Sequence, residues 1–158
     1  MKTYLSFSSE ETKKLGEKLA KRILKSRLGK TAKIVALRGE LGSGKTTFVQ
    51  GFFRGLGLKR APSPTFIIMR RSALKNRKYK NVFHVDAYRL QKSKELKILE
   101  FGEVLKNPLN VVIIEWAEKI KRILPRPHRF AKHGGQARNT FWLKFSHGKK
   151  ENERKISL

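Results

Sequence analysis

Residues 39–46 read GELGSGKT, in which glycine stands at the first and sixth positions and Lys45 and Thr46 follow. This is the G-x-x-x-x-G-K-[ST] pattern of a phosphate-binding loop, whose glycines leave backbone N–H groups free to face phosphate oxygens. In that pattern Lys45 would reach the β- and γ-phosphates, and the Thr46 hydroxyl would bind Mg²⁺. The alternative interpretation is a glycine-rich turn that holds no ligand.

The sequence on both sides of the loop favours the phosphate-binding interpretation. Residues 32–37, AKIVAL, form an apolar run typical of a buried strand. After the loop, apolar residues recur at helical spacing, and a natural helix stop follows at Gly57; the apolar set is Phe48, Val49, Phe52, Phe53 and Leu56. A strand that enters the loop and a helix that leaves it place the N–H groups at a helix N-terminus, where anions bind.

The rest of the chain alternates between strand and helix patterns, which predicts one α/β domain over residues 1–158. Ser8, with Glu11 three residues later, predicts a capping box for an amphipathic helix. Further helices are expected from near Ser93 and, as a short one, after Trp116 and before Pro125. The expected strands are 3–7 (TYLSF), 66–71 (FIIMRR), 81–90 (NVFHVDAYRL), 111–115 (VVIIE), 140–145 (TFWLKF) and 154–158 (RKISL), and the second and third of these flank a turn-like segment, as in an antiparallel hairpin.

Two acidic residues end apolar segments of the predicted sheet. Asp86 closes VFHVD and Glu115 closes VVIIE. A phosphate loop needs a second metal anchor, normally an acid at the end of a neighbouring buried strand, and the carboxyl ends of parallel strands are where α/β sheets bind ligands. Either acid could serve, and for each of them a structural ion pair is the alternative.

Composition restricts the compartment and the partners. Lys plus Arg number 38 against 12 Asp plus Glu, a formal charge of +26. Such an excess favours a polyanionic partner such as nucleic acid, although a lysine-rich solvated surface explains it equally well. Cysteine is absent, which excludes disulfides and thiolate metal sites and favours a reducing, cytoplasmic compartment. No apolar run approaches the roughly 18 residues of a membrane span, so we expect a soluble protein.

The scarcity of aspartate also bears on the nucleotide. Asp86 is the only Asp in the chain. The Asn-Lys-x-Asp motif that gives Ras-like GTPases their guanine specificity cannot be built, because Phe83, His84 and Val85 precede Asp86. The Asp-x-x-Gly switch motif fails too, since the third residue after Asp86 is Arg89. ATP is therefore favoured over GTP.

Four motifs taken together resemble a known family. The extended loop motif GELGSGKTTFVQGFFRGLG is followed by SPTF (63–66), HVDAYRL (84–90) and IIEWAEKI (113–120), in the order and spacing of the TsaE (YjeE) family. This is the P-loop ATPase of bacterial tRNA threonylcarbamoyladenosine (t6A) synthesis. The resemblance covers nearly the whole chain.

The resemblance implies a three-layer fold of the P-loop NTPase type, with a mainly parallel central sheet and antiparallel additions. It also implies Mg-ATP binding, slow intrinsic hydrolysis and a working complex with TsaD and TsaB. Those partners transfer the threonylcarbamoyl group to adenosine 37 of ANN-decoding tRNAs, so a family member is an ATPase but not the transferase.

Carried over position by position, the resemblance implies roles for individual residues. Thr46 and Glu115 match the magnesium positions, and Asp86 matches an acid that would position the attacking water. Thr65 would approach the γ-phosphate, with a plain Pro-Thr turn as the alternative. Ser9 and Thr12 fall near the nucleotide base, although both could instead be helix-capping or surface residues. The remaining nucleotide contacts are the loop residues Glu40, Leu41, Gly42, Ser43, Gly44, Lys45 and Thr46, together with Thr47.

Two other functions remain open from the sequence. A small-molecule P-loop phosphotransferase would share the length and the loop, but no segment resembles its acceptor pocket or lid. A basic RNA-binding module with a vestigial loop would normally interleave aromatic and basic residues, and this chain does not. The basic segment 126–139 has no assigned role. We interpret His128, His133 and His147 as loop residues rather than metal ligands, because no carboxylate accompanies them at ligand spacing.

Overall fold

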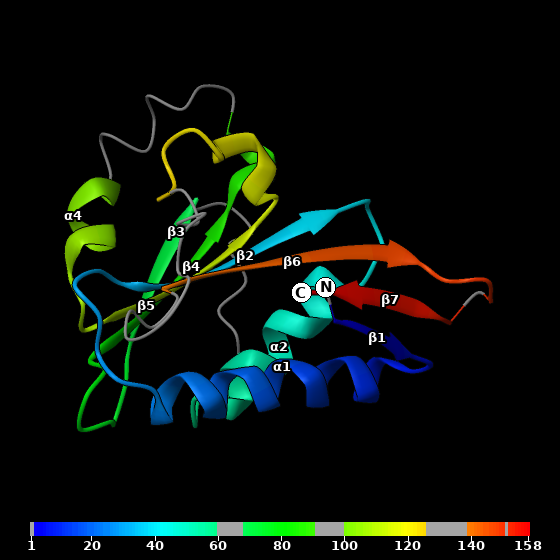
Figure 1. The fold of residues 1–158 in the computed structure, drawn as a ribbon, viewed down its shortest axis with the longest axis horizontal. Coiled ribbons are helices and arrows are strands. Elements are labelled where there is room, and N and C mark those ends of the chain that lie inside the picture. The colour runs from blue at the N-terminus through cyan, green and yellow to red at the C-terminus, as the bar shows by residue number, and fades with distance from the viewer. Residues whose placement is uncertain (1, 60–67, 91–99, 126–138, 151) are drawn as a thin grey trace.

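A computed structural model describes the chain except for residues 1, 60–67, 91–99, 126–138 and 151 (Figure 1). The expected alternation of strands and helices is present. In chain order the elements are β1 (Thr3–Ser6), α1 (Ser9–Lys25), β2 (Lys33–Gly39), α2 (Lys45–Gly55), β3 (Met69–Ala73), β4 (Asn81–Asp86), the 3₁₀ helix η1 (Ala87–Arg89), α4 (Phe101–Lys106), β5 (Asn110–Glu115), the 3₁₀ helix η2 (Ala117–Ile120), β6 (Thr140–His147) and β7 (Arg154–Ser157).

The described strands form one sheet in the order β1-β7-β6-β2-β5-β4-β3. Its centre is parallel, because β2 pairs in parallel with both β5 and β6, and β5 pairs in parallel with β4. Its edges are antiparallel, with β3 on one side and β7 and β1 on the other. The predicted fold class is confirmed: a mainly parallel sheet with antiparallel additions, built around the strand that enters the loop.

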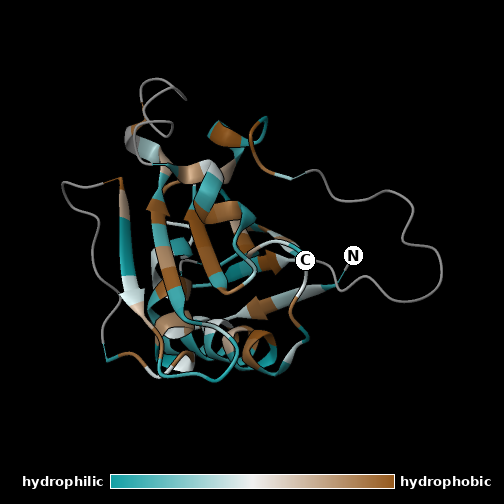
Figure 2. Ribbon diagram, turned by 90° about the vertical axis from the view of Figure 1, so that its left-hand side faces the viewer, coloured by the Kyte–Doolittle hydropathy of each residue, from teal (hydrophilic) through white to brown (hydrophobic). Residues whose placement is uncertain are grey.

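Helices cover both faces of the sheet and make the fold three-layered. The long helices α1 and α2 lie against one face, while α4 lies on the opposite side (Figure 1). The side chains of β2 alternate between the two layers: Val35 and Leu37 join the core under α1 and α2, and Ile34 and Ala36 join the core under α4 and η2. Burial on both faces explains why residues 34–37 of this strand are continuously apolar. Figure 2 shows the hydrophobic colouring concentrated in the central strands.

Close packing of α1 on α2 holds the helix that follows the loop. A Cβ atom at Gly16 of α1 would overlap the carbonyl oxygen of Phe48, and one at Gly51 of α2 would overlap that of Lys13. The two helices therefore approach backbone to backbone, which only glycine permits at these positions. This contact fixes α2, and with it the loop, against the sheet.

The start of α1 shows the predicted cap with one change. The Ser8 hydroxyl accepts a 3.1 Å hydrogen bond from the Glu11 backbone N–H, as a capping box requires. The Glu11 carboxylate accepts instead from the N–H of Phe7, at 2.7 Å, one residue before the cap. The cap therefore also ties the end of β1 to α1.

Several predicted boundaries were wrong. β3 continues to Ala73, because Ser72 and Ala73 pair with Val82 and Asn81 of β4. The predicted strand 81–90 ends at Asp86, where η1 begins, and the short helix after Trp116 is a 3₁₀ helix of four residues. The expected helix start near Ser93 and nearly all of the basic segment 126–139 lie outside the described residues. In the described part, no helix has the length and apolar character needed to cross a membrane.

Candidate functional site

The loop between β2 and α2 has the backbone conformation that its glycines predict. Gly39, Gly42 and Gly44 have φ angles of 135°, 71° and 95°. Such positive values are readily adopted only by glycine. Gly44 is also the N-cap of α2, where no side chain caps the helix. The first N–H groups of an 11-residue helix are thus available to an anion.

Lys45 begins α2 and folds back over the loop. Its ammonium group donates to the carbonyl oxygens of Gly39 at 2.8 Å and Glu40 at 2.6 Å, and lies 4.0 Å from the centre of the Trp116 ring. Burial lowers the pKa of Lys45, and surrounding carboxylates, Glu115 foremost, oppose that shift. The loop therefore holds a buried cation whose hydrogen-bond partners are carbonyls that a phosphate could replace.

Hydrogen bonds link Thr46 of the loop helix to two buried side chains, Glu115 and His84, on two strands. The Thr46 hydroxyl donates to Oε2 of Glu115 at 2.7 Å, and Nε2 of His84 lies 3.0 Å from Oε1 of the same carboxylate. Glu115 is 5% exposed and His84 is 1% exposed. Since a carboxylate only accepts, His84 donates to it. Three elements, α2, β5 and β4, thus converge on the carboxylate of Glu115.

The two acids that the sequence left as alternatives are neighbours with different partners. Asp86 and Glu115 are paired residues at the ends of β4 and β5. The Asp86 carboxylate accepts a 3.0 Å hydrogen bond from the backbone N–H of Tyr88 and caps η1. It is half-buried, whereas Glu115 is buried. Of the two, Glu115 accepts the hydrogen bond from Thr46, the residue whose hydroxyl the loop pattern assigns to a metal.

A cavity of about 360 Å³ opens beside the loop. It brings together three segments that are far apart in the chain: the start of α1, the loop with the start of α2, and β7 with the turn before it. The predicted base contacts Ser9 and Thr12 lie in it together with the predicted phosphate contact Thr47. The cavity is lined by Phe7, Ser8, Ser9, Thr12, Gly42, Gly44, Thr47, Asn152 and Arg154.

The remaining predicted loop contacts differ in exposure. Ser43 is buried, and its hydroxyl donates to the carbonyl of Glu40 at 2.6 Å. Glu40 is exposed, and Leu41 is 76% exposed at the tip of the loop. The interpretation of His147 as a loop residue was wrong, because it ends β6 and its Nε2 lies 3.1 Å from the carbonyl oxygen of Leu41. Thr65, His128 and His133 lie outside the described residues.

Three residues at the site were not assigned a role from the sequence. His84 stands two residues before Asp86 on β4, so strand alternation alone places both on one face of the sheet. Glu118 of η2 lies at the start of the loop, where its carboxylate faces the N–H of Gly39 at 3.4 Å. Arg154 lines the cavity from β7, and no local signal in the sequence connects that strand with the loop.

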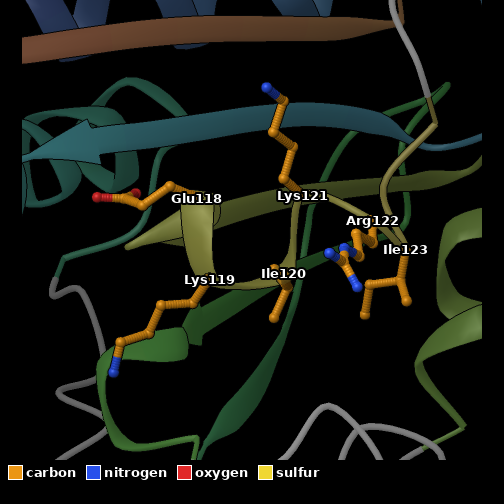
Figure 3. Close-up of a pocket in the computed structure, with 6 residues that line it drawn as sticks. All are labelled: Glu118, Lys119, Ile120, Lys121, Arg122 and Ile123. Atoms are coloured by element: carbon orange, nitrogen blue, oxygen red, sulfur yellow. The ribbon is translucent and has the colours of Figure 1, made fainter.

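A second cavity, of about 320 Å³, lies along η2 and the turn after it. Figure 3 shows its lining side chains, Glu118 to Ile123, pointing in different directions rather than toward a common centre. Ligand sites usually have a few polar groups that converge. This cavity therefore lacks the arrangement that the loop cavity shows.

The donor groups at the loop match one common type of magnesium site. Among the described residues, no cluster of three or more His, Cys, Asp or Glu side chains could hold a metal ion. Mg²⁺ is commonly held by one or two protein ligands, with waters and substrate phosphates completing the shell. A hydroxyl and a carboxylate in contact, beside an uncapped helix N-terminus, match that donor set.

The central strand, glycine loop and Lys-Thr helix start define the chain as a P-loop-type α/β protein. The family model "Threonylcarbamoyl adenosine biosynthesis protein TsaE" matches residues 6–155. The chain belongs to the TsaE family, which is named for its part in t6A biosynthesis.

Curated relatives and a solved structure agree with this assignment. A Rickettsia conorii protein named tRNA threonylcarbamoyladenosine biosynthesis protein TsaE is 36% identical over 122 residues, 76% of this chain and 63% of that protein. The Bacillus subtilis protein of the same name is 34% identical over 119 residues, covering 74% of this chain and 67% of that one. The crystal structure of Bacillus subtilis YdiB matches with a TM-score of 0.65 and 26% identity, covering 98% of this chain and 82% of that chain.

Proposed function

We propose that this protein binds and hydrolyses Mg-ATP as a subunit required for t6A formation at position 37 of ANN-decoding tRNAs, together with TsaD and TsaB. The observation that carries the proposal is the contact between Thr46 and Glu115 beneath the glycine loop. A buried carboxylate is costly unless it meets positive charge or hydrogen-bond donors. Glu115 ends β5 and meets Thr46 on the first turn of the loop helix, where a phosphate-bound metal would supply that charge.

The loop would bind the phosphates through two sets of donors. The first is the uncapped N–H groups at the start of α2, exposed by the positive φ of Gly42 and Gly44. The second is the Lys45 ammonium group, which now donates to the carbonyls of Gly39 and Glu40. In the proposed function the triphosphate replaces those carbonyls, and Lys45 neutralises charge on its β- and γ-phosphates.

The metal would be held by the Thr46 hydroxyl and the Glu115 carboxylate. Magnesium bound there would neutralise charge that develops between the β- and γ-phosphates. The protein's part is to hold the two ligands in contact before binding. His84 takes one oxygen of Glu115 and leaves the other directed at Thr46.

Asp86 would then position the attacking water, since it stands beside Glu115 and is less buried. Thr65 is proposed to approach the γ-phosphate. The nucleoside would lie in the cavity that Ser9, Thr12 and Thr47 share with the loop. The loop residues Glu40, Leu41 and Ser43 complete the proposed phosphate site, with Ser43 holding the loop in shape through Glu40.

The proposed partners follow from the family. The names of the relatives place them in t6A biosynthesis on tRNA. We infer that TsaD and TsaB carry out the transfer, and that ATP hydrolysis by this subunit alone is slow and is raised by them. A cytoplasmic location belongs to the same proposal.

One assay separates this function from the alternatives. ATP hydrolysis is measured for the protein alone, with a panel of small phosphate acceptors, and with TsaB–TsaD plus an ANN-decoding tRNA. We expect hydrolysis to rise strongly only with the protein partners, and no acceptor to be phosphorylated. Phosphate on an acceptor would identify a phosphotransferase instead, and a protein that never binds ATP would leave the loop without its proposed role.

A further inference from the structure

The strands β6, β7 and β1 have one face that no described helix covers. The opposite face packs on α1 and α2, through Phe145 of β6 and Ile156 of β7 among others. On the side of α4 and η2, η2 reaches the end of β2, where the Glu118 carboxylate faces the N–H of Gly39, and Figure 1 shows no helix above β7 and β1. Residues that alternate with Phe145 and Ile156 therefore face outward from this part of the sheet.

Three cations lie on that open face. Arg38 of β2 is the paired residue of Lys144 on β6, and Lys155 of β7 is the paired residue of Ser146, two positions along β6 from Lys144. All three side chains are exposed. Their parity along the strands places them on the side of Ile34 and Ala36, away from α1 and α2. We call Arg38, Lys144 and Lys155 the basic face.

The arrangement is unfavourable for the isolated protein. Arg38 and Lys144 are exposed paired residues of the parallel strands β2 and β6, so their like charges repel each other through water. None of the residues of β1, β2, β6 and β7 is acidic, so no carboxylate on these strands offsets the repulsion. Exposed cations with no carboxylate on the same strands are suited to contact with a polyanion.

The other side chains on this side of the three strands are mostly hydroxyls; the apolar exceptions are Leu5 and Trp142, and Trp142 packs against the core under α4 and η2. The Thr3 and Ser157 hydroxyls lie 3.0 Å apart, and Ser146 lies in the row of Lys155 and Leu5. Cations and hydroxyls are the side chains that contact phosphate and sugar oxygens. The core of a protein interface is instead depleted in lysine and enriched in aromatics. The composition favours RNA over a protein partner.

We propose that the basic face binds the phosphate backbone of the tRNA substrate directly. The proposal rests on the proposed function for the identity of the RNA, and it adds the surface and the chemistry of contact. Arg38 immediately precedes Gly39, so RNA on this face would lie beside the start of the glycine loop. The contact would be to the backbone and therefore independent of base sequence.

The test compares two triple variants of equal charge. The first is Arg38→Gln/Lys144→Gln/Lys155→Gln. The matched control is Arg22→Gln/Lys14→Gln/Lys18→Gln, which removes one Arg and two Lys from exposed positions of α1. Affinity for an ANN-decoding tRNA transcript is measured by fluorescence anisotropy over a series of KCl concentrations, without nucleotide.

We expect log K to fall less steeply with log [salt] in the basic-face variant. The magnitude of the negative slope should decrease by about 2 to 3, since each phosphate contact contributes about 0.7 to 0.9. The control should change the slope by less than about 1. The basic-face variant should also be at least as stable as the wild type, because a like-charge pair is removed. Equal effects of the two variants, or no effect of either, would overturn the proposal.

Two further measurements keep this outcome separate from the ATPase proposal. ATP affinity should be unchanged in both triple variants, so loss of tRNA binding with normal ATP binding supports the surface alone. Binding to TsaB–TsaD is measured on the same proteins. A variant that keeps tRNA affinity but loses the protein partners would contradict the proposal and assign the basic face to a protein interface.

Discussion

The hydroxyl of Thr46 donates a 2.7 Å hydrogen bond to Oε2 of Glu115 and joins the first turn of α2 to the end of β5. The two residues are 69 positions apart in the chain. Their contact explains why an acidic side chain ends a buried strand: its oxygens meet donors from Thr46 and His84 in place of water.

Replacing Lys45 by alanine should weaken ATP binding about 10- to 100-fold, since a hydrogen bond to a charged group contributes about 1.5–3 kcal/mol. Isothermal titration calorimetry checks this on the protein alone. Lys14→Ala, at an exposed position of α1, is the control and should bind normally. Unchanged affinity in Lys45→Ala would rule out the loop as the phosphate site.

Asp86→Asn should slow ATP hydrolysis about 100-fold or more while leaving ATP affinity within about twofold, because a water-positioning residue acts in the chemical step. Single-turnover hydrolysis and calorimetry on the same preparation separate the two effects. If metal binding survived in Glu115→Ala and was lost in Asp86→Ala, the roles of the two acids would be reversed.

His84→Ala should weaken metal binding about 10- to 100-fold, because Glu115 loses the donor that orients it. His84→Gln, whose amide can donate to the same oxygen, should restore most of the loss. Val82→Ala is the control for general destabilisation, because it creates a cavity on the same strand away from Glu115. Mn²⁺ affinity in the presence of ATP, followed by electron paramagnetic resonance, gives a readout that does not depend on turnover. Equal losses in the alanine and glutamine variants would mean that His84 only fills space.

Lys33→Met should stabilise the fold by roughly 1 kcal/mol at pH 7. Lys33 is 1% exposed and its ammonium group donates to the Asn139 amide oxygen at 2.8 Å, so its charge is buried without a carboxylate in that contact. Burial lowers the pKa of Lys33 below the ordinary lysine value of 10.5.

The stability difference between Lys33→Met and the wild type should change with pH in a definite direction. Below the folded-state pKa both states of the wild type are protonated, and the full destabilisation is present. As the pH rises from the lowered pKa toward 10.5, the unfolded state binds more protons than the folded state, so the wild type gains stability. The advantage of Lys33→Met should therefore shrink between pH 7 and pH 10 in urea titrations. An advantage that grows with pH would contradict the burial argument.

Much of the fold could be predicted because local signals agreed with the tertiary structure. The glycine pattern 39–46, the apolar run before it and the Ser8 cap each specify a backbone conformation through a few neighbouring residues. Boundaries failed where partners decide them. β3 extends to Ala73 because β4 offers backbone groups with which Ser72 and Ala73 pair. The side chains of Ser72 and Ala73 do not predict this pairing.

The site could be predicted as far as its motifs reach. Glu115 stood out as an acid after four buried aliphatics, and its partner Thr46 belongs to a recognisable pattern. His84 and Arg154 were missed because their roles depend on which strands are neighbours. β4 lies next to β5, and β7 lies beside β6 and β1, and these adjacencies are long-range properties of the sheet.

The central claim is that Thr46 and Glu115 hold magnesium beneath bound ATP. The most direct measurement is ATP affinity with and without Mg²⁺, by calorimetry, in the wild type and in Glu115→Gln, which keeps the shape of the side chain and removes its charge. We expect Mg²⁺ to raise the affinity of the wild type at least about tenfold and to raise that of Glu115→Gln by less than about twofold. The same dependence on Mg²⁺ in both proteins would contradict the claim.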